Sequence, residues 1–272
     1  MHPKSTRPVT EWSRTTELLR QLVVREIAES IKGSSLGIVW LVVSPLLSMC
    51  LYVIVFGLLF GGKFGKIENE TSLNYAIGIY VGLSVVSLVN ETIAKSTNSL
   101  IRQGNLIRKV VFPLELLPVV QVAGTAFKLG VNAVLWLLMG AFFGSVLRPE
   151  ILHLLLLFLP MLGIALGLAS LISAVSVYFR DIQQLTNVMT QIVFWSSGVF
   201  YSSEKVQQIP ELWIILKWNP VLLAIENVRA IVLWGLSPDF SQVAYLYIVA
   251  VILMGLGFGV FRRLKSGFAD FL

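Results

Sequence analysis

Long apolar runs are the feature that most constrains how this chain of 272 residues can fold. A helix of roughly 20 apolar residues spans the hydrocarbon core of a bilayer, and several runs of about that length occur here. Only 13% of the residues are charged, whereas an ordinary soluble domain has about 25%. The sequence therefore predicts an all-α integral membrane protein. The predicted spans are residues 37–60, 73–93, 116–146, 151–177, 185–201 and 243–261.

Residues 207–234 are apolar but interrupted by prolines and charges, so they form either a seventh span or two half-helices that enter the membrane and return. Cytoplasmic loops are enriched in Lys and Arg. With six spans, both termini are cytoplasmic, and fourteen of the 21 basic residues lie on that side against six outside. A seventh span would place Arg262, Arg263 and Lys265 outside. We therefore predict six transmembrane helices with an outer re-entrant helical pair, whose backbone protein or water must cover.

We predict one polytopic membrane domain over residues 1–272. Residues 1–36 form an N-terminal cytoplasmic segment, residues 37–261 carry the six spans, and residues 262–272 form a cytoplasmic tail. Within the first segment, residues 16–32 have the helical spacing of an amphipathic helix that lies in the membrane interface. Arg25 and Lys32 are candidates for contact with anionic lipid headgroups. A simple membrane anchor is the alternative.

Composition and motifs exclude several classes of function. The net charge of +6 reflects basic residues beside the spans, and no nucleic-acid-binding motif is visible. Cys50 is the single cysteine, so we predict neither an internal disulfide nor a metal site. No G-x-x-x-x-G-K-[ST] phosphate loop occurs, so the chain cannot hydrolyse ATP by that route. We expect no enzyme activity and no cofactor in this chain.

A polar and basic island at about residues 96–112 separates the second and third predicted spans. Its apolar residues are interleaved with basic ones, and Pro113 must end any helix there. The pattern indicates a short amphipathic helix at a membrane surface, or else a basic loop that only sets topology. The candidate docking residues in the island are Leu100, Ile101, Arg102, Asn105, Leu106, Ile107, Arg108 and Lys109.

The order of residues 105–118, NLIRKVVFPLELLP, resembles the cytoplasmic coupling helix of ABC exporter permeases that move O-antigen, capsule or teichoic-acid polysaccharides. The resemblance continues over nearly the whole chain. Tyr178–Asp181 is similar to the fourth cytoplasmic turn of that family. Its outer gating segment resembles residues 202–240 and the turn before them, in particular Gly198–Tyr201, Ile209–Trp213, Trp218–Pro220 and Glu226–Arg229. The family often has Pro-Val where this chain has Gly198-Val199.

The resemblance implies the permease subunit of an ATP-driven exporter in the cytoplasmic (inner) membrane. Its substrate would be a lipid-linked polysaccharide, most typically O-antigen on a polyprenyl diphosphate carrier, with capsule or teichoic acid as alternatives. The implied partners are two copies of a separate ABC subunit that binds ATP and Mg, and a second copy of this chain, since six helices are too few to enclose a polymer channel. Membrane lipids are the remaining partner. Residues 96–112, the coupling segment, would dock into a groove of the ATP-binding subunit.

Sugars pack their C–H faces on aromatic rings, so a sugar channel needs aromatic side chains. An interfacial aromatic belt is the alternative for such residues. Lys128 lies inside a predicted span, where it must face protein, water or a partner. The candidates for the channel and its outer gate are Phe194, Trp195, Phe200, Tyr201, Trp218, Glu226 and Arg229.

Two other classes compete. A secondary transporter would show internal repeats and several ionisable groups within its spans. A membrane enzyme acting on a polyprenyl lipid would need clustered carboxylates or histidines at one surface. The sequence shows neither pattern clearly.

Overall fold

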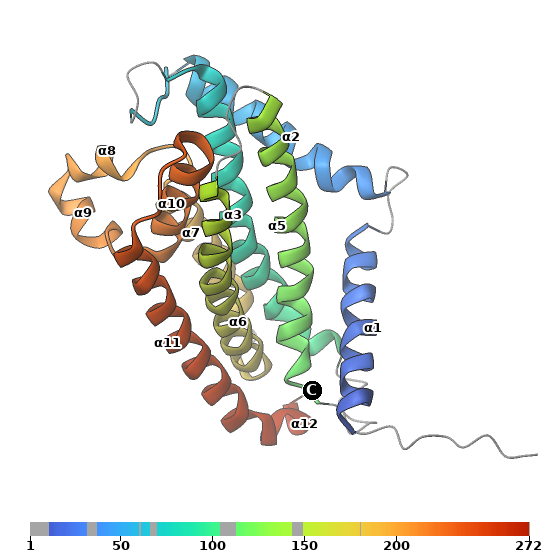
Figure 1. Cartoon of the computed structure of the whole chain (residues 1–272). Coiled ribbons are helices and arrows are strands. Elements are labelled where there is room, and N and C mark those ends of the chain that lie inside the picture. The colour runs from blue at the N-terminus through green and yellow to red at the C-terminus, as the bar shows by residue number, and fades with distance from the viewer. Residues whose placement is uncertain are drawn as a thin grey trace, which may run out of the picture.

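The computed structural model is a bundle of helices (Figure 1). It describes residues 11–31, 37–59, 61–65, 70–103, 113–142, 149–179 and 181–271. Within these ranges all regular secondary structure is helical, which confirms the all-α prediction. In the orientation of Figure 1, the chain has a lower end, where α12 (Phe268–Phe271) lies, and an upper end, where α8 (Ser203–Gln207) and α9 (Pro210–Leu216) project sideways.

Five helical stretches among the described residues are long and apolar enough to cross a membrane. The predicted spans 37–60, 73–93, 116–146, 151–177 and 243–261 fall on them. The first combines α2 (Trp40–Tyr52) with the π-helical turn η2 (Val53–Leu59). The others are α3 (Ser72–Ser99), α5 (Leu116–Phe142), η4 (Pro149–His153) with α6 (Leu154–Tyr178), and α11 (Phe240–Leu264) with η5 (Lys265–Gly267).

The predicted fifth span, residues 185–201, is wrong at both of its boundaries. α7 (Ile182–Ser196) begins three residues earlier and ends five residues earlier. Gly198 has a φ of 73°, a left-handed conformation that ends helices and that glycine adopts without steric cost. The 15 residues of α7 cover about 22 Å at 1.5 Å per residue, less than a bilayer core of about 30 Å. The count of six spans therefore stays a prediction.

The broken region, residues 207–234, holds two helices, and α8 ends at the residue where this region begins. α8 and α9 lie outside the bundle, whereas α10 (Pro220–Trp234) is buried inside it (Figure 1). Pro220 occupies the first turn of α10, and the Asn219 side chain accepts hydrogen bonds from the amides of Val221 and Leu222. Both features favour a helix start at this point. Whether this region re-enters the membrane stays a prediction.

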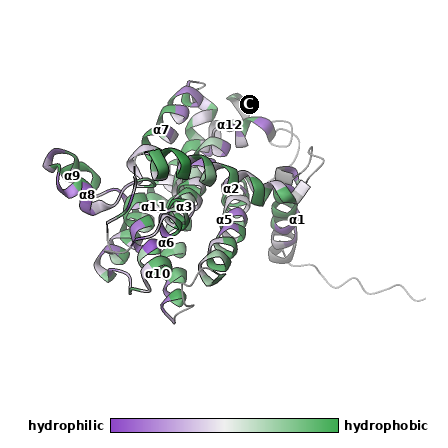
Figure 2. Ribbon diagram, turned by 90° about the horizontal axis from the view of Figure 1, so that it is seen from above, coloured by the Kyte–Doolittle hydropathy of each residue, from purple (hydrophilic) through white to green (hydrophobic). Residues whose placement is uncertain are grey.

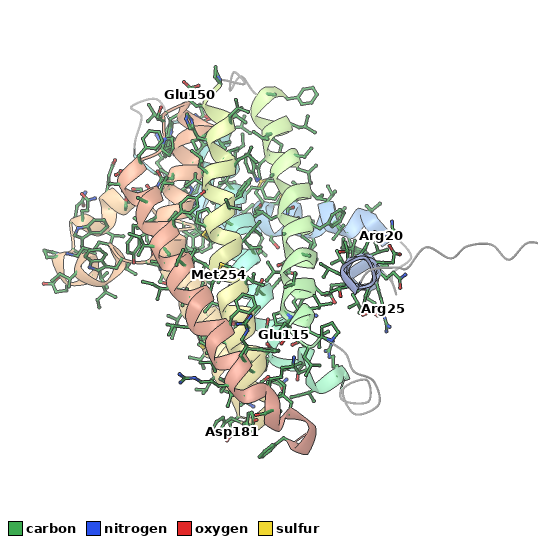
Figure 3. The ribbon with its side chains drawn as sticks, turned by 60° about the horizontal axis from the view of Figure 1, so that its bottom comes forward. Arg20, Arg25, Glu115, Glu150, Asp181 and Met254 are labelled. Atoms are coloured by element: carbon green, nitrogen blue, oxygen red, sulfur yellow. The ribbon has the colours of Figure 1, made fainter. Side chains whose placement is uncertain are left out.

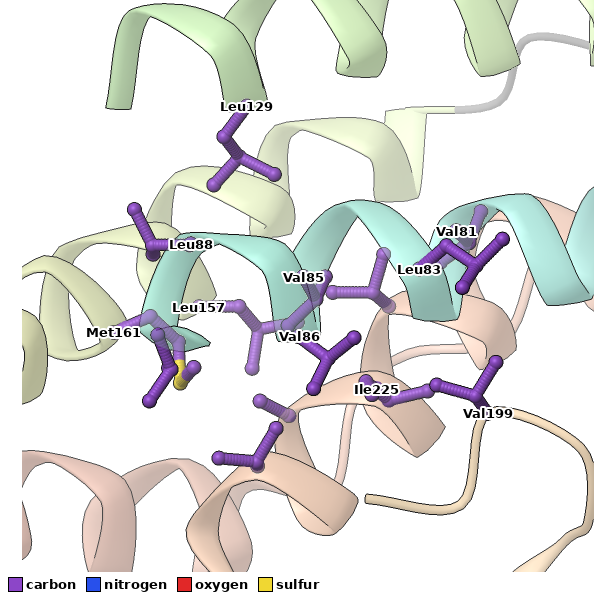
Figure 4. Close-up of a cluster of buried hydrophobic side chains, with 14 of the residues drawn as sticks. Val81, Leu83, Val85, Val86, Leu88, Leu129, Leu157, Met161, Val199 and Ile225 are labelled. Carbon is purple, nitrogen blue, oxygen red and sulfur yellow. The ribbon is translucent and has the colours of Figure 1, made fainter. Parts of the chain in front are cut away.

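α3 is the central helix of the bundle, and it packs against α5, α6, α7, α10 and α2. Most of its side chains are buried, because neighbours surround it on nearly every side. Its contacts form one continuous apolar core. Figure 4 shows part of this core, including Val81, Leu83, Val85, Val86 and Leu88 of α3, Leu129 of α5, Leu157 and Met161 of α6, Ile225 of α10, and Val199 in the turn that follows residue 196.

α6 and α11 approach each other closely through glycines. A Cβ atom on Gly257 would lie 2.2 Å from the carbonyl oxygen of Gly167, and one on Gly167 would lie 2.4 Å from the backbone of Leu253. Small residues let membrane helices pack backbone against backbone. These two helices therefore form the tightest pair of the bundle.

α2 is the least covered of the long helices. None of its residues is buried, and Cys50 is exposed. Seen from above, the long helices are mostly hydrophobic, and hydrophilic residues are more frequent in α1 (Glu11–Ile31) and α8 (Figure 2). The outer surface of α2 is thus apolar and without a protein neighbour among the described residues.

α1 is amphipathic, as predicted for residues 16–32, and it packs against the lower part of α5 (Figure 1). Figure 3 shows α1, with Arg20 and Arg25, almost end-on while α5 is seen along its length, so the two helices cross at an angle. The placement of α1 in the membrane interface stays a prediction.

Candidate functional site

The lower end of the bundle holds the two ends of the coupling segment. α3 runs into Leu100 and the short helix η3 (Ile101–Gln103), and the chain resumes at Pro113 before α5. Arg102 and Ile101 are exposed. Asn105, Leu106, Ile107, Arg108 and Lys109 lie outside the described residues, so their docking role stays a prediction.

Leu100 corrects part of that prediction, because this chain itself buries it completely. It belongs to a small lower cluster that joins α3, α5, α6, α11 and α12, made of Leu100, Leu114, Leu117, Ala174, Val177, Phe261 and Phe268. A side chain buried in its own fold offers no surface to a partner. Leu100 therefore fixes the start of the coupling segment, and Ile101 is the exposed apolar residue beside it.

The far side of the coupling segment is joined to the C-terminal tail. The Lys265 Nζ atom donates to Glu115 Oε1 at 2.7 Å, and the hydroxyl of Tyr178 donates to the carbonyl of Leu264 at 2.7 Å. Partial burial raises the pKa of the Glu115 carboxyl. The hydrogen bond from Lys265, a backbone hydrogen bond and the charges of Lys265 and Arg262 outweigh that effect, so the pKa is lowered below its ordinary value. The tail is thus held, partly by charge, to the residue that lies between the coupling segment and α5.

α1 contributes a carboxylate to the same end. Glu26 forms an ion pair with Lys95 of α3 at 2.7 Å and accepts a longer hydrogen bond from Gln121 of α5 at 3.4 Å. Arg25, a lipid-headgroup candidate, is exposed and pairs with Glu29 at 2.7 Å. Lys32, the other candidate, lies outside the described residues.

At the upper end, Arg229 of α10 is completely buried. Its guanidinium donates short hydrogen bonds to three backbone carbonyls, those of Gly78 at 2.9 Å, Gly198 at 2.8 Å and Val199 at 2.6 Å, and a longer one to the carbonyl of Tyr201 at 3.4 Å. The Glu226 carboxylate lies 3.5 Å away, and the Phe64 ring lies 4.1 Å from the guanidinium carbon. Five donors in a rigid fork suit such a set of acceptors. Arg229 therefore clasps α10, α3 and the Gly198 turn together.

The predicted channel aromatics divide into buried and exposed members. Phe200 is buried and stacks on Phe56 with ring centroids 4.3 Å apart, in a group with Tyr52 and Phe194. The hydroxyl of Tyr201 donates to the carbonyl of Trp195 at 2.8 Å. Trp195 and Trp218 are exposed, at 57% and 59%. The structure brings Phe194, Trp195, Phe200 and Tyr201 together, whereas the ring of Trp218 packs against Tyr245 of α11.

A cavity of about 510 Å³ with both polar and apolar lining lies between α2, α3 and α5, with Phe194 of α7 at its edge. Lys128 forms an ion pair with Glu91 across it at 2.7 Å, and Asn132 accepts a hydrogen bond from Tyr80 at 2.9 Å. Lys128, which lies inside a predicted span, is thus paired with a carboxylate of the protein itself. The serine hydroxyls that complete the polar lining come from Ser44, Ser48, Ser84 and Ser87.

One face of α7 is polar although the helix lies in an apolar bundle. Gln184, Asn187 and Gln191 recur at helical spacing on it and are exposed, and Trp195 continues the same face. An amide without a hydrogen-bond partner in an apolar medium costs about 2–7 kcal/mol. This face is therefore suited to water or a polar partner rather than lipid.

Sequence reasoning did not find three of these features: the polar face of α7, the Glu91–Lys128 pair and the Glu26 contacts. The spacing of Gln184, Asn187 and Gln191 was a readable signal for the first. The other two depend on which turns of different helices face each other, and no single helix carries that information.

The chain is therefore a multi-pass helical membrane protein with a polar helix face, an internal ion pair and a basic connection at its lower end. It belongs to the ABC-2 type transporter family, whose model matches residues 17–233.

Two similar curated proteins are O-antigen export system permeases named RfbA. The one from Myxococcus xanthus is 24% identical over 97% of this chain and 98% of its own length. One from Klebsiella pneumoniae is 25% identical over 94% and 95%. The capsule polysaccharide export inner-membrane protein CtrC of Neisseria meningitidis is 21% identical over 90% of each chain.

Proposed function

We propose that this chain is the permease subunit of an ATP-driven exporter that moves a lipid-linked polysaccharide, most typically O-antigen on a polyprenyl diphosphate carrier, across the inner membrane. The observation that carries the proposal is the polar face of α7 beside Trp195, in a chain similar over its whole length to O-antigen export permeases. Amide groups bind sugar hydroxyls, and aromatic rings pack on sugar C–H faces. Capsule polysaccharide is the second candidate, favoured by the similarity to CtrC.

Two copies of the chain would face each other through α7 and the uncovered α2 and enclose the channel. Two ABC subunits that bind ATP and Mg would dock at the lower end, which then faces the cytoplasm with both termini. Exposed Ile101 and Arg102 border that docking site. ATP hydrolysis belongs to those subunits and not to this chain.

Purification and transport test the proposal. The chain should co-purify with an ABC subunit, and vesicles containing the complex should move lipid-linked polysaccharide only when ATP is supplied. Ile107→Asp should abolish this association but leave membrane insertion intact, because it places a charge on the predicted apolar docking face. Arg102→Ala, a change at the rim, should have a mild effect. Transport that needs an ion gradient instead of ATP would favour a secondary transporter.

The channel role of α7 has a separate test. Gln191→Leu should slow export because it removes a hydrogen-bonding group from the sugar path, while ATPase association stays normal. Gln21 of α1, exposed on a different helix, offers the matched control Gln21→Leu. Equal export by both variants and the unaltered protein would contradict a channel at this face.

A further inference from the structure

The carboxylate of Glu26 bridges two helices that are not adjacent to it in sequence. Its Oε1 atom accepts from Lys95 Nζ of α3 at 2.7 Å. Its Oε2 atom accepts from Gln121 Nε2 of α5 at 3.4 Å. One side chain of α1 therefore contacts both α3 and α5 at once.

The positions of these two partners are specific. Lys95 lies four residues before the end of α3, and Gln121 lies in the second turn of α5. The coupling segment connects those two helix ends. Glu26 thus contacts both of the arms, the end of α3 and the start of α5, that carry the coupling segment.

The contact is closely fitted. A Cβ atom on Gly124 of α5 would lie 2.8 Å from Glu26 Cγ, so glycine is what lets α1 approach at this point. Gln121 is 7% exposed, and the side chains of Lys95 and Glu26 are 26% and 16% exposed. A charge that is mostly withdrawn from water is stabilised by partners, and both carboxylate oxygens of Glu26 have one.

Other carboxylates of α1 differ from Glu26. Glu17 bonds to Arg20 and Gln21, and Glu29 pairs with Arg25, all within α1 and exposed to solvent. Such pairs stabilise the helix itself. Glu26 instead reaches across to two other elements.

We propose that Glu26 is a positioning residue that clamps α1 to both arms of the coupling segment. α1 and the segment then move as one unit when the ATP-binding subunits close and open. This inference rests on the docking role proposed above.

Charge reversal tests the clamp in vesicles that contain the complex of permease and ATP-binding subunit. The measured quantity is polysaccharide transported per ATP hydrolysed. Glu26→Lys and Lys95→Glu each place like charges together, and each should lower this ratio about fivefold or more, the lower range of a coupling between sites. ATPase co-purification should stay unchanged. The double variant should return the ratio to near its normal value, since the amide of Gln121 can accept as well as donate. Glu29→Lys, on the exposed side of α1, is the matched control.

Single variants with a normal ratio would overturn the clamp, as would a double variant that remains as poor as the single ones. If the unaltered chain co-purified with no ATP-binding subunit, the proposed function would be contradicted, and with it the role of the clamp in coupling.

A pair of cysteines tests the clamp without reversed charges, which could themselves prevent folding. Glu26→Cys with Gly124→Cys, in a Cys50→Ala background, places two thiols at the observed close approach. Oxidation should link α1 to α5 and raise the transport ratio above that of the reduced protein. Failure to form the disulfide, or equal ratios in both states, would overturn the proposal.

Discussion

The two ends of the bundle are held together by different kinds of contact. At the upper end, one fully buried guanidinium binds three backbone carbonyls from α3 and the Gly198 turn. At the lower end, partly exposed ion pairs join α1 to the end of α3 (Glu26–Lys95) and the start of α5 to the tail (Glu115–Lys265). Water and salt weaken the lower pairs, whereas they do not reach the upper clasp.

This difference teaches how such a protein can be firm and movable at once. The buried clasp fixes the frame of the upper end, because its loss would leave a charge or several carbonyls without partners. The lower pairs exchange easily with water, so the coupling segment can shift without unfolding its surroundings. Motion should therefore start at the lower end and be resisted at the upper end.

The largest effect expected is that of Arg229→Ala. It removes the donors for three buried carbonyls and leaves Glu226 without this cation, and breaking such a buried set costs about 3–5 kcal/mol. The variant should lose most of its thermal stability in detergent, measured by the unfolding midpoint or by recovery as a monodisperse peak after heating.

Arg263→Ala is the matched control, since Arg263 is exposed at the lower end of α11. Arg229→Lys should recover little, because a single ammonium cannot reach all three carbonyls. If Arg229→Ala and Arg263→Ala had equal midpoints, the upper end would be no firmer than the lower.

An intermediate effect is expected in the cavity between the two ends. Lys128→Ala leaves the Glu91 carboxylate without its partner, at a cost of about 1–3 kcal/mol. The side chains of Lys128 and Glu91 are 25% and 37% exposed, so rehydration should limit the loss. Lys128→Gln combined with Glu91→Gln should recover stability. A double-mutant cycle of unfolding midpoints measures the coupling, and additive effects would contradict a functional pair.

The smallest effect is expected at the lower end, for Glu115→Gln. The folded-state pKa of Glu115 is lowered from 4.5, so the carboxylate stabilises the fold at pH values above 4.5. That contribution is lost as pH falls through the lowered pKa. The variant should lose about 0.2–1 kcal/mol at neutral pH, and nothing under more acidic conditions. A stability difference that persists in acid would show that shape, not charge, matters there.

The fold class was predictable because the length of the apolar runs directly indicates membrane-spanning helices. The five long helical stretches match predicted spans, and the amphipathic α1 follows from its spacing alone. The C-terminal boundary of α7 was not predictable in this way, because apolar residues continue to Tyr201 while the positive φ of Gly198 ends the helix earlier.

The candidate site was predictable only in part. The partners of Arg229 are backbone carbonyls of distant residues, and a carbonyl looks the same at every position of a sequence. The sequence therefore predicted a gate role for Arg229 and could not predict that it joins α10 to α3 and the Gly198 turn. The register that joins Glu26 to Lys95 and Gln121 is likewise set by packing between helices. Lys128 was the exception, because a lysine within a span required a partner.

The exposed thiol of Cys50 is a natural attachment site for a chemical probe on α2. Charged alkylating reagents react slowly with a thiol that faces hydrocarbon and readily with one that faces water. The rate of alkylation would thus report whether this side of α2 meets lipid or an aqueous path. With a single cysteine in the sequence, a nitroxide attached there would give one distance between two copies, in the natural protein and without any substitution.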